Sequence, residues 1–302
     1  MVSRDDVVWC YNTFLMRQPE SEDVVNLWLK NCRSIRDLVR GFHESPEFQQ
    51  LASLKAFAKS DETMYYKTPL GFLFPIRMND PAMYRTYVSN SYEEPETDFI
   101  RKHTGAGQHV IDIGARHGWF SCVMSQSVGS RGHVYCYDPD PLAATHVQEC
   151  ITVNRFENVS FEGCALGAEA GRLSFDGVDA TLQTNGHVGS NVITVDVKRL
   201  DDLLGSRMQP ISFIKIDVEG AEHMVFEGAR DVIKSDRPII LMELNDPLSR
   251  RVSGVPVMDT VAYLREFGYR YTDLDGRPLS IDDMKRAVQG NRIVNIGLFA
   301  TN

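Results

Sequence analysis

The sequence predicts an α/β protein: a parallel sheet covered by helices on both faces, preceded by a small all-helical domain. From about residue 109 onward, apolar runs of strand length alternate with helical patterns, which is the order of successive βαβ units. The runs at 211–216 and 239–242 are almost wholly apolar, as expected for strands buried on both faces. Residues 5 to about 50 show apolar side chains at helical spacing only, which indicates the helical domain.

The N-terminal helices are expected to be short and separated by polar breaks. Apolar residues from Val7 to Leu15 form the first helical face. Ser21 and Ser34 each precede another amphipathic stretch, so both are expected to cap helices. Ser45-Pro46 is expected to open a fourth helix, because proline suits a first turn. We expect residues 1–56 to form this domain.

Residues 57–302 are expected to form the second domain, with its core sheet beginning near residue 109. The segment 57–100 is rich in aromatic residues and turns, a pattern that fits both short strands and an aromatic lid, and a helix is expected from residue 94. The expected strands are 109–114, 132–138, 158–165, 172–175, 192–197, 210–218, 238–244, 269–273 and 294–300. The expected helices are 119–128, 142–153, 221–234 and 258–267.

Composition limits the function classes. The 302 residues carry 32 basic and 41 acidic side chains, a formal charge of −9, and the basic residues are scattered. Nucleic acid is therefore not expected as the main partner. The six cysteines form no C-x-x-C pair, which favours reduced thiols and a cytoplasmic location over a metal site or disulfides. No apolar run approaches the about 20 residues that cross a bilayer, and the first residues lack the apolar region typical of a signal peptide, so a soluble protein is expected.

The loop Asp112-Ile113-Gly114-Ala115-Arg116-His117-Gly118 follows the first core strand, where parallel sheets bind ligands. Gly114 and Gly118 allow the backbone to pass close to a ligand. Arg116 replaces the middle glycine of G-x-G-x-x-G, at the point where a pyrophosphate would approach. Asp112 would repel a diphosphate but suits a ligand that carries an ammonium group. The loop therefore favours S-adenosylmethionine over a nicotinamide dinucleotide.

Asp138 ends the second core strand and is followed by Pro139. A carboxylate at this place can accept hydrogen bonds from both hydroxyls of a ribose. A dinucleotide would use the same acid, so Asp138 indicates a nucleoside cofactor without naming it. The alternative is an Asx residue that starts a turn. Cys164 and Ala165 end the third strand, where an adenine edge could meet backbone groups.

Together with downstream residues, these motifs resemble the FkbM family of methyltransferases over roughly residues 90–300. The strongest element is Ile214-Lys215-Ile216-Asp217-Val218-Glu219-Gly220-Ala221-Glu222. The other stretches are 94–96, 110–121, 137–141, 154–159, 197–203, 228–229, 238–243, 268–269 and 295–299. The resemblance implies a Rossmann-like, seven-stranded methyltransferase sheet and O-methylation, frequently of a sugar hydroxyl. Arg116 and His117 depart from the Asn and aliphatic residue that the family usually has.

A hydroxyl that receives a methyl group must lose its proton to an acceptor. Asp217, at the end of the fourth core strand, is the first candidate for this base or for orienting the acceptor. Glu243 is the second candidate and Glu219 the third. Alternatively, Asp217 and Glu219 accept backbone hydrogen bonds at the start of the next helix. Oxygen ligands for Mg²⁺ exist on Asp217, Glu243, Asn245 and Asp246, but the sequence shows no convergence, and no metal is expected.

The expected donor-binding residues are Glu94, Asp112, Gly114, Ala115, Arg116, Gly118, Trp119, Phe120, Asp138, Pro139, Cys164, Ala165 and Asp217. The acceptor is expected to be a small molecule or a glycan that offers a hydroxyl, held by the segments 65–92 and 171–195. Two rival functions are a nicotinamide-dependent oxidoreductase and a non-catalytic module that binds glycans or a partner.

The helical domain resembles a short helical domain of unknown function that often lies beside glycan-related enzymes in bacteria. The residues that carry this likeness are Tyr11, Phe14-Leu15, Arg17, Pro19, Trp28 and Phe42 to Phe48. The usual glycine near Glu22 is missing. An ordinary helical cap is the alternative.

Overall fold

The computed structural model describes residues 2–15, 17–50, 63–77, 79–177, 180–183, 192–205, 209–289 and 292–301. The chain divides into two compact units, Met1–Tyr66 with Pro75–Asn90, and Lys67–Phe74 with Ser91–Asn302. The expected domain boundary at residues 56 and 57 lies outside the described residues. Among the described residues, every helix is too short or too polar to cross a membrane.

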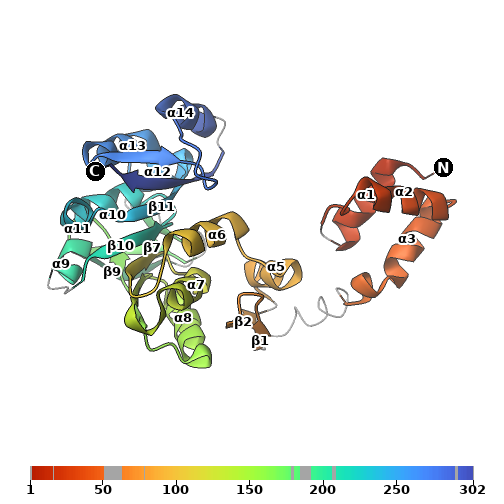
Figure 1. Ribbon diagram of the computed structural model, residues 1–302, viewed down its shortest axis with the longest axis horizontal. Coiled ribbons are helices and arrows are strands. Elements are labelled where there is room, and N and C mark those ends of the chain that lie inside the picture. Colours follow the sequence, from red (N-terminus) through yellow and green to blue (C-terminus); the bar gives the residue numbers. More distant parts are fainter. Residues whose placement is uncertain are drawn as a thin grey trace. The chain divides into compact units, whose positions relative to one another are not determined.

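The first unit begins with a group of short helices that pack around one apolar core (Figure 1). They are α1 (Arg4–Cys10), the π-helix η1 (Tyr11–Leu15), α2 (Glu22–Asn31) and α3 (Ile35–Glu44). The hydroxyls of Ser21 and Ser34 accept hydrogen bonds from the amides of Val24 and Asp37, so both predicted caps are confirmed. Residues 46–50 are also helical, as predicted. The core centres on Phe42, whose ring stacks on Trp28 at a centroid distance of 4.4 Å.

The aromatic-rich segment forms two short strands and a helix. The strands β1 (Thr63–Lys67) and β2 (Leu73–Arg77) pair with one another. The helix α5 (Pro81–Ser89) begins after Asp80, whose carboxylate accepts the amides of Ala82 and Met83 at 2.8 and 3.1 Å. The predicted helix at residue 94 is α6 (Glu94–His103).

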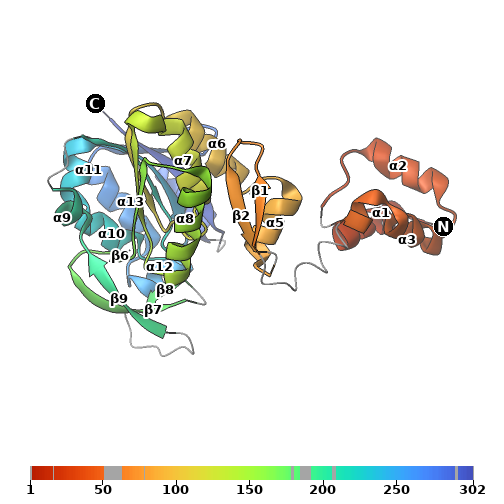
Figure 2. The ribbon, with the colours of Figure 1, turned by 90° about the horizontal axis from the view of Figure 1, so that it is seen from below.

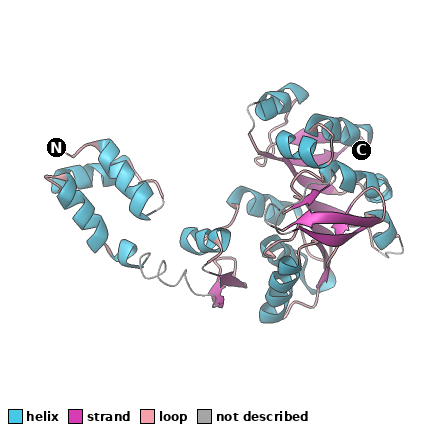
Figure 3. Ribbon diagram, turned by 180° about the vertical axis from the view of Figure 1, so that it is seen from behind, coloured by secondary structure: helices cyan, strands magenta, loops and turns pink. Residues whose placement is uncertain are grey.

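A seven-stranded sheet forms the centre of the second unit (Figure 3). Its strand order is β12-β13-β11-β10-β3-β4-β5. The bounds are β3 His109–Ile113, β4 His133–Tyr137, β5 Val159–Glu162, β10 Ile211–Ile216, β11 Ile239–Leu244, β12 Tyr269–Thr272 and β13 Val294–Ala300. The sequence predicts a parallel sheet, and this is wrong near one edge, because β13 runs antiparallel to β11 and β12. The order reverses at β3, between β10 and β4, so ligands are expected at the carboxyl ends of these strands.

Helices cover both faces of this sheet (Figure 2). One face carries α6, α7 (Trp119–Val128) and α8 (Pro141–Asn154), and the other carries α9 (Leu200–Leu204), α10 (Glu222–Gly228), α11 (Arg230–Asp236) and α13 (Val257–Glu266). The single helix expected at 221–234 is wrong: it divides at Ala229, after Gly228, where a Cβ atom would lie 2.0 Å from the carbonyl oxygen of Gly167. Three of the described helices of this unit were not predicted: α9, α12 (Asp246–Val252) and α14 (Ile281–Gln289).

A second sheet has the order β6-β9-β7-β8. Its strands are β6 Ala165–Leu166, β7 Gly171–Asp176, β8 Thr181–Gln183 and β9 Val192–Lys198. The strand expected at 158–165 is therefore divided, since β5 ends at Glu162 and Ala165 pairs with Val197 of β9. The expected acceptor segment 171–195 lies partly outside the described residues.

Candidate functional site

The loop after β3 is shaped by two glycines in left-handed conformations. Gly114 has a φ of +82°, and a Cβ atom there would lie 1.8 Å from the backbone oxygen of Asp217. Gly118 has a φ of +80°, and its Cβ would lie 3.3 Å from the Cα atom of Val147 in α8. Both positions therefore need glycine for contacts within the chain. The loop is held against the end of β10 on one side and against α8 on the other.

Asp138 follows β4 and fastens this loop to the next strand. Its side chain accepts hydrogen bonds from the backbone amides of Arg116 (Oδ2, 2.8 Å) and Asp140 (Oδ1, 2.9 Å). The residue is only 7 % exposed, and burial raises the pKa of its carboxyl to about 6, although both hydrogen bonds lower it. Each oxygen retains a lone pair that a ribose hydroxyl could use. The arrangement fits a nucleoside. Pro139, the next residue, is half-buried.

Lys215 is a polar residue of the site that the sequence interpretation missed. It is 5 % exposed, and the register of β10 with β3 places it opposite Asp112. Its Nζ atom donates to the carbonyl of Gly114 at 3.2 Å and lies 3.6 Å from Oδ2 of Asp217. Burial disfavours the ammonium, but nearby carboxylates, Asp217 foremost, outweigh it and raise the pKa of Lys215. A lysine within an otherwise apolar strand was the signal that could have identified it.

Asp112 is fully buried below the loop. Its Oδ2 atom accepts a hydrogen bond of 2.6 Å from the hydroxyl of Ser121, and its Oδ1 atom lies 3.9 Å from Nζ of Lys215. Burial raises the pKa of Asp112, opposed by the ammonium of Lys215 and by Ser121. A contact between Asp112 and the donor's ammonium stays a prediction, and within the described structure the ammonium beside Asp112 belongs to Lys215.

Three carboxylates meet at the carboxyl ends of β10 and β11. Oxygen atoms of Asp217, Glu219 and Glu243 all lie within 4.8 Å of one another. Burial, with the negative charges of Asp217 and Glu219, raises the pKa of Glu243 to about 8. Burial also raises the pKa of Glu219, whose backbone is left-handed with a φ of +51°. The three candidate proton acceptors from the sequence are therefore brought together.

Such a group of oxygens could also hold a divalent cation. Its acidic members differ from those considered from the sequence, because Glu219 takes part and Asp246 does not. The side-chain amide of Asn245 donates a hydrogen bond to the carboxylate of Glu243 at 3.4 Å. The carboxylate of Asp246 accepts hydrogen bonds from the guanidinium of Arg250 at 2.7 Å and from the backbone amide of Val257 at 2.9 Å. The convergence that the sequence did not show is thus a product of the fold.

Aromatic side chains surround Trp119, the first residue of α7, which directly follows the loop after β3. The Trp119 ring is enclosed by Phe72, Phe74 and Tyr92 at centroid distances of 5.1, 5.1 and 5.8 Å, and its Nε1 atom donates to the hydroxyl of Thr97 at 3.0 Å. Trp119 therefore packs mainly against the chain itself.

Phe120, by contrast, lies beside the polar cluster. The ammonium of Lys215 is 5.1 Å from the centre of its ring, and Tyr92 contacts the same ring at 5.7 Å. Tyr92 was expected only as part of the segment 65–92. Burial, aided by the charges of Glu93 and Asp217, raises the pKa of its hydroxyl. Phe120 and Tyr92 thus place apolar surface next to the carboxylates.

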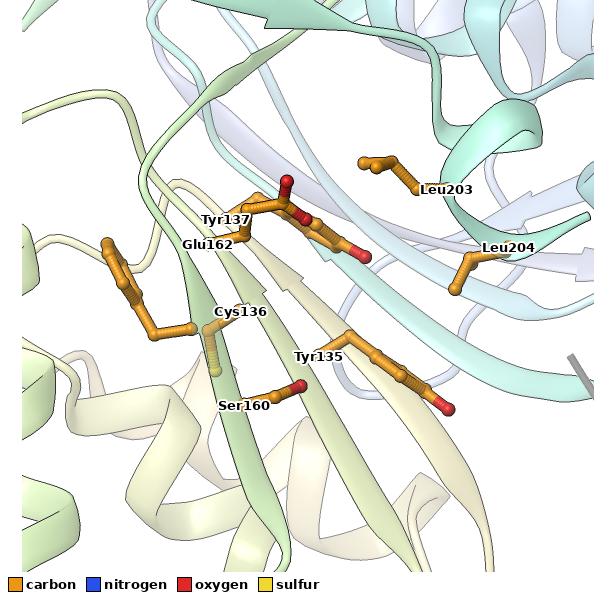
Figure 4. Close-up of a pocket in the computed structure, with 8 residues that line it drawn as sticks. Tyr135, Cys136, Tyr137, Ser160, Glu162, Leu203 and Leu204 are labelled. Atoms are coloured by element: carbon orange, nitrogen blue, oxygen red, sulfur yellow. The ribbon is translucent and has the colours of Figure 1, made fainter.

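The remaining expected donor residues are scattered along the edge of the sheet. Glu94 is exposed in the first turn of α6, Ala115 is buried in the loop, Cys164 is buried between β5 and β6, and Ala165 belongs to β6. A pocket of about 320 Å³ lies between β4, β5 and α9 (Figure 4). Its lining residues are Tyr135, Cys136, Tyr137, Ser160, Phe161, Glu162, Leu203 and Leu204. Tyr137, one of these lining residues, directly precedes Asp138 in the chain.

Comparisons with known proteins concern the methyltransferase family and fold. Residues 112–271 match the model of the methyltransferase FkbM domain. No curated protein matches the chain. Among solved structures, the chain is similar to a methyltransferase FkbM from Methylobacillus flagellatus KT, with 14% identity over 94% of this chain and 72% of that one and a TM-score of 0.44. It is also similar to a putative methyltransferase from Streptococcus mutans in complex with SAH, with 11% identity over 69% and 97% of the two chains and a TM-score of 0.41.

The family model covers more than half of the chain, including the loop after β3, Asp138 and the three carboxylates. This match identifies a methyltransferase, and it sets aside the nicotinamide-dependent oxidoreductase and the non-catalytic module. The chain belongs to the FkbM family of methyltransferases, whose methyl donor is S-adenosylmethionine.

Proposed function

We propose that this enzyme transfers the methyl group to a hydroxyl oxygen of a sugar or of a glycan-linked small molecule. The observation that carries the proposal is the convergence of Asp217, Glu219 and Glu243 within 4.8 Å at the carboxyl ends of β10 and β11. A hydroxyl loses its proton as its oxygen bonds to the methyl carbon, and a carboxylate is a suitable acceptor for that proton.

The donor half of the site is assigned to the loop after β3 and to Asp138. S-adenosylmethionine supplies a methyl group made electrophilic by a positively charged sulfur. The carboxylate of Asp138 would accept the ribose hydroxyls, and Arg116 could contact the carboxylate of the donor. Backbone groups at Cys164 and Ala165 would meet the adenine edge.

In the acceptor half, Asp217 is proposed to orient the hydroxyl and to receive its proton, with Glu243 and then Glu219 as the next candidates. The charge of Asp217 and the oxygen lone pairs of the neighbouring glutamates oppose an acceptor that carries a phosphate or a carboxylate. A neutral polyol fits better, because carboxylate oxygens accept hydrogen bonds from neighbouring hydroxyls. The formal charge of −9 likewise disfavours nucleic acid as the acceptor. From its unpaired cysteines, we expect the enzyme to act in the cytoplasm.

The test uses S-adenosylmethionine with an isotopically labelled methyl group and a panel of free hexoses, deoxyhexoses and their glycosides. We expect label in at least one of these compounds, detected by mass spectrometry, in an ether that survives mild alkali. Label released by alkali would indicate a methyl ester and contradict the proposal. Label transferred only to nuclease-sensitive material would also contradict it. The Asp138→Ala variant, expected to bind no donor, is the control for background methylation.

A further inference from the structure

We propose that Lys215 is a positioning residue that joins the loop after β3 (residues 114–118, here called the donor loop) to the carboxylate of Asp217 on the acceptor side. The part of this inference that concerns the acceptor rests on the proposed function of Asp217. The part that concerns the donor depends only on the contacts between Lys215 and the loop after β3.

The position of the ammonium distinguishes this role from simple neutralisation of Asp112. An ammonium seated on one carboxylate lies about 2.7–2.9 Å from its oxygen. Nζ of Lys215 instead lies 3.9 Å from Asp112, 3.6 Å from Asp217 and 3.2 Å from the Gly114 carbonyl. The ammonium is therefore shared among three groups and is closest to the donor loop. Oδ1 of Asp112 accepts no hydrogen bond from the described residues, which agrees with this sharing.

The three groups belong to separate pieces of the site. Asp112 is part of β3, Gly114 is part of the donor loop, and Asp217 follows β10. The Gly114 backbone also packs so closely on the Asp217 carbonyl that no Cβ fits between them. Lys215 thus fixes the side chain of Asp217 and the carbonyl of Gly114 at the same junction.

The surroundings of Lys215 support a fixed position. The side chain is almost fully buried, and the Phe120 ring lies beside the ammonium at 5.1 Å. The charges of Glu93 and Asp138 also act on the ammonium, and Lys215 in turn acts on the carboxyl of Glu219. A buried ammonium held by several fixed partners has little rotational freedom, so its removal is expected to loosen the groups that it holds.

The experiment compares Lys215→Met in an Asp112→Asn background with Asp112→Asn alone. The double variant contains neither buried charge of the pair, which avoids leaving Asp112 without a cation. The two proteins differ only at residue 215. Calorimetry with S-adenosylmethionine and with S-adenosylhomocysteine should show that the double variant binds both about tenfold or more weakly than Asp112→Asn, since a hydrogen bond to the loop is lost. Turnover of any acceptor found should fall by a larger factor, because Asp217 also loses its partner.

Melting temperatures check that the double variant is folded, and Lys234→Met, an exposed lysine in α11, controls for the substitution itself. Equal donor affinity in the double variant and in Asp112→Asn, within about twofold, would overturn the inference and leave Lys215 as a counter-charge to Asp112. The binding measurements need no acceptor. If the wild type binds the donor but methylates no hydroxyl compound, the proposed function fails while the inference about Lys215 is still decided by binding.

Discussion

The backbone amide of Arg116 donates a hydrogen bond of 2.8 Å to Oδ2 of Asp138. This bond joins the donor loop to the end of β4. Because the contact uses the backbone, it does not depend on the Arg116 side chain, which is exposed. The departure from the usual family residue at this position is therefore compatible with an intact loop. Arg116 does adopt a left-handed conformation, with a φ of +43°.

Replacing Asp138 with alanine should abolish measurable donor binding. The variant removes the proposed ribose acceptor and also the group that holds the loop through the Arg116 amide. Loss of two hydrogen bonds to a charged group corresponds to an affinity about 100-fold lower or more. Calorimetry with S-adenosylmethionine measures this, and Asp138→Asn, which keeps one acceptor oxygen, should bind with intermediate affinity. Affinity within threefold of wild type in Asp138→Ala would contradict the assignment.

Gly114→Ala should destabilise the fold by more than about 2 kcal/mol, because its Cβ would lie 1.8 Å from the Asp217 backbone oxygen in a conformation that already disfavours alanine. Gly107 is a matched control: its φ is +83°, yet a Cβ there would meet nothing within 4 Å. Gly107→Ala should therefore cost only about 1 kcal/mol for the conformation. Urea unfolding of both variants separates the clash from the strain, and equal losses would show that the close approach to Asp217 is unimportant.

The sequence predicts those features that depend on local patterns. The bounds of α7, the caps at Ser21 and Ser34 and the alternation of β3, α7, β4 and α8 follow from periodicity and turn residues. The loop after β3 and Asp138 could be proposed as donor-binding from the sequence, because a glycine motif and an acid after a strand are signals within the chain.

Features that depend on pairing between distant segments could not be predicted in the same way. Lys215 meets Asp112 only because β10 pairs with β3, about a hundred residues earlier. The direction of β13 is not written in its apolar pattern, since both directions give the same alternation. The division between α10 and α11 lies next to Gly228, where Gly167 of another segment packs closely.

Asp217→Asn should separate donor binding from turnover. Asparagine preserves the shape of the side chain but cannot receive the acceptor's proton, so turnover should fall about 100-fold or more. Affinity for S-adenosylmethionine should stay within about threefold of wild type. Asp259→Asn, an exposed residue of α13, is the control for the substitution and should leave both quantities unchanged. Unchanged turnover in Asp217→Asn would move the role of base to Glu243 or Glu219.

Glu222 provides a prediction about stability and pH. Its carboxyl is buried at the start of α10 and accepts hydrogen bonds from the amides of Val218 (3.2 Å) and Gly220 (3.3 Å). Burial raises its pKa from 4.5 to about 7, more than the hydrogen bonds lower it. Between these two pH values the folded protein binds a proton that the unfolded chain does not. The free energy of unfolding should therefore decrease as the pH rises from about 4.5 to about 7, and this contribution should then level off.

Glu222→Gln should remove that decrease, because glutamine accepts the same two hydrogen bonds and carries no charge at any pH. At pH 8 the variant should be more stable than wild type by on the order of 1–3 kcal/mol, whereas near pH 4.5 the two should be nearly equal. Urea unfolding at both pH values measures the difference, and Glu266→Gln, exposed at the end of α13, is the control. An identical pH dependence in Glu222→Gln and wild type would show that Glu222 is already ionised in the folded protein, and that the amides of Val218 and Gly220 outweigh its burial.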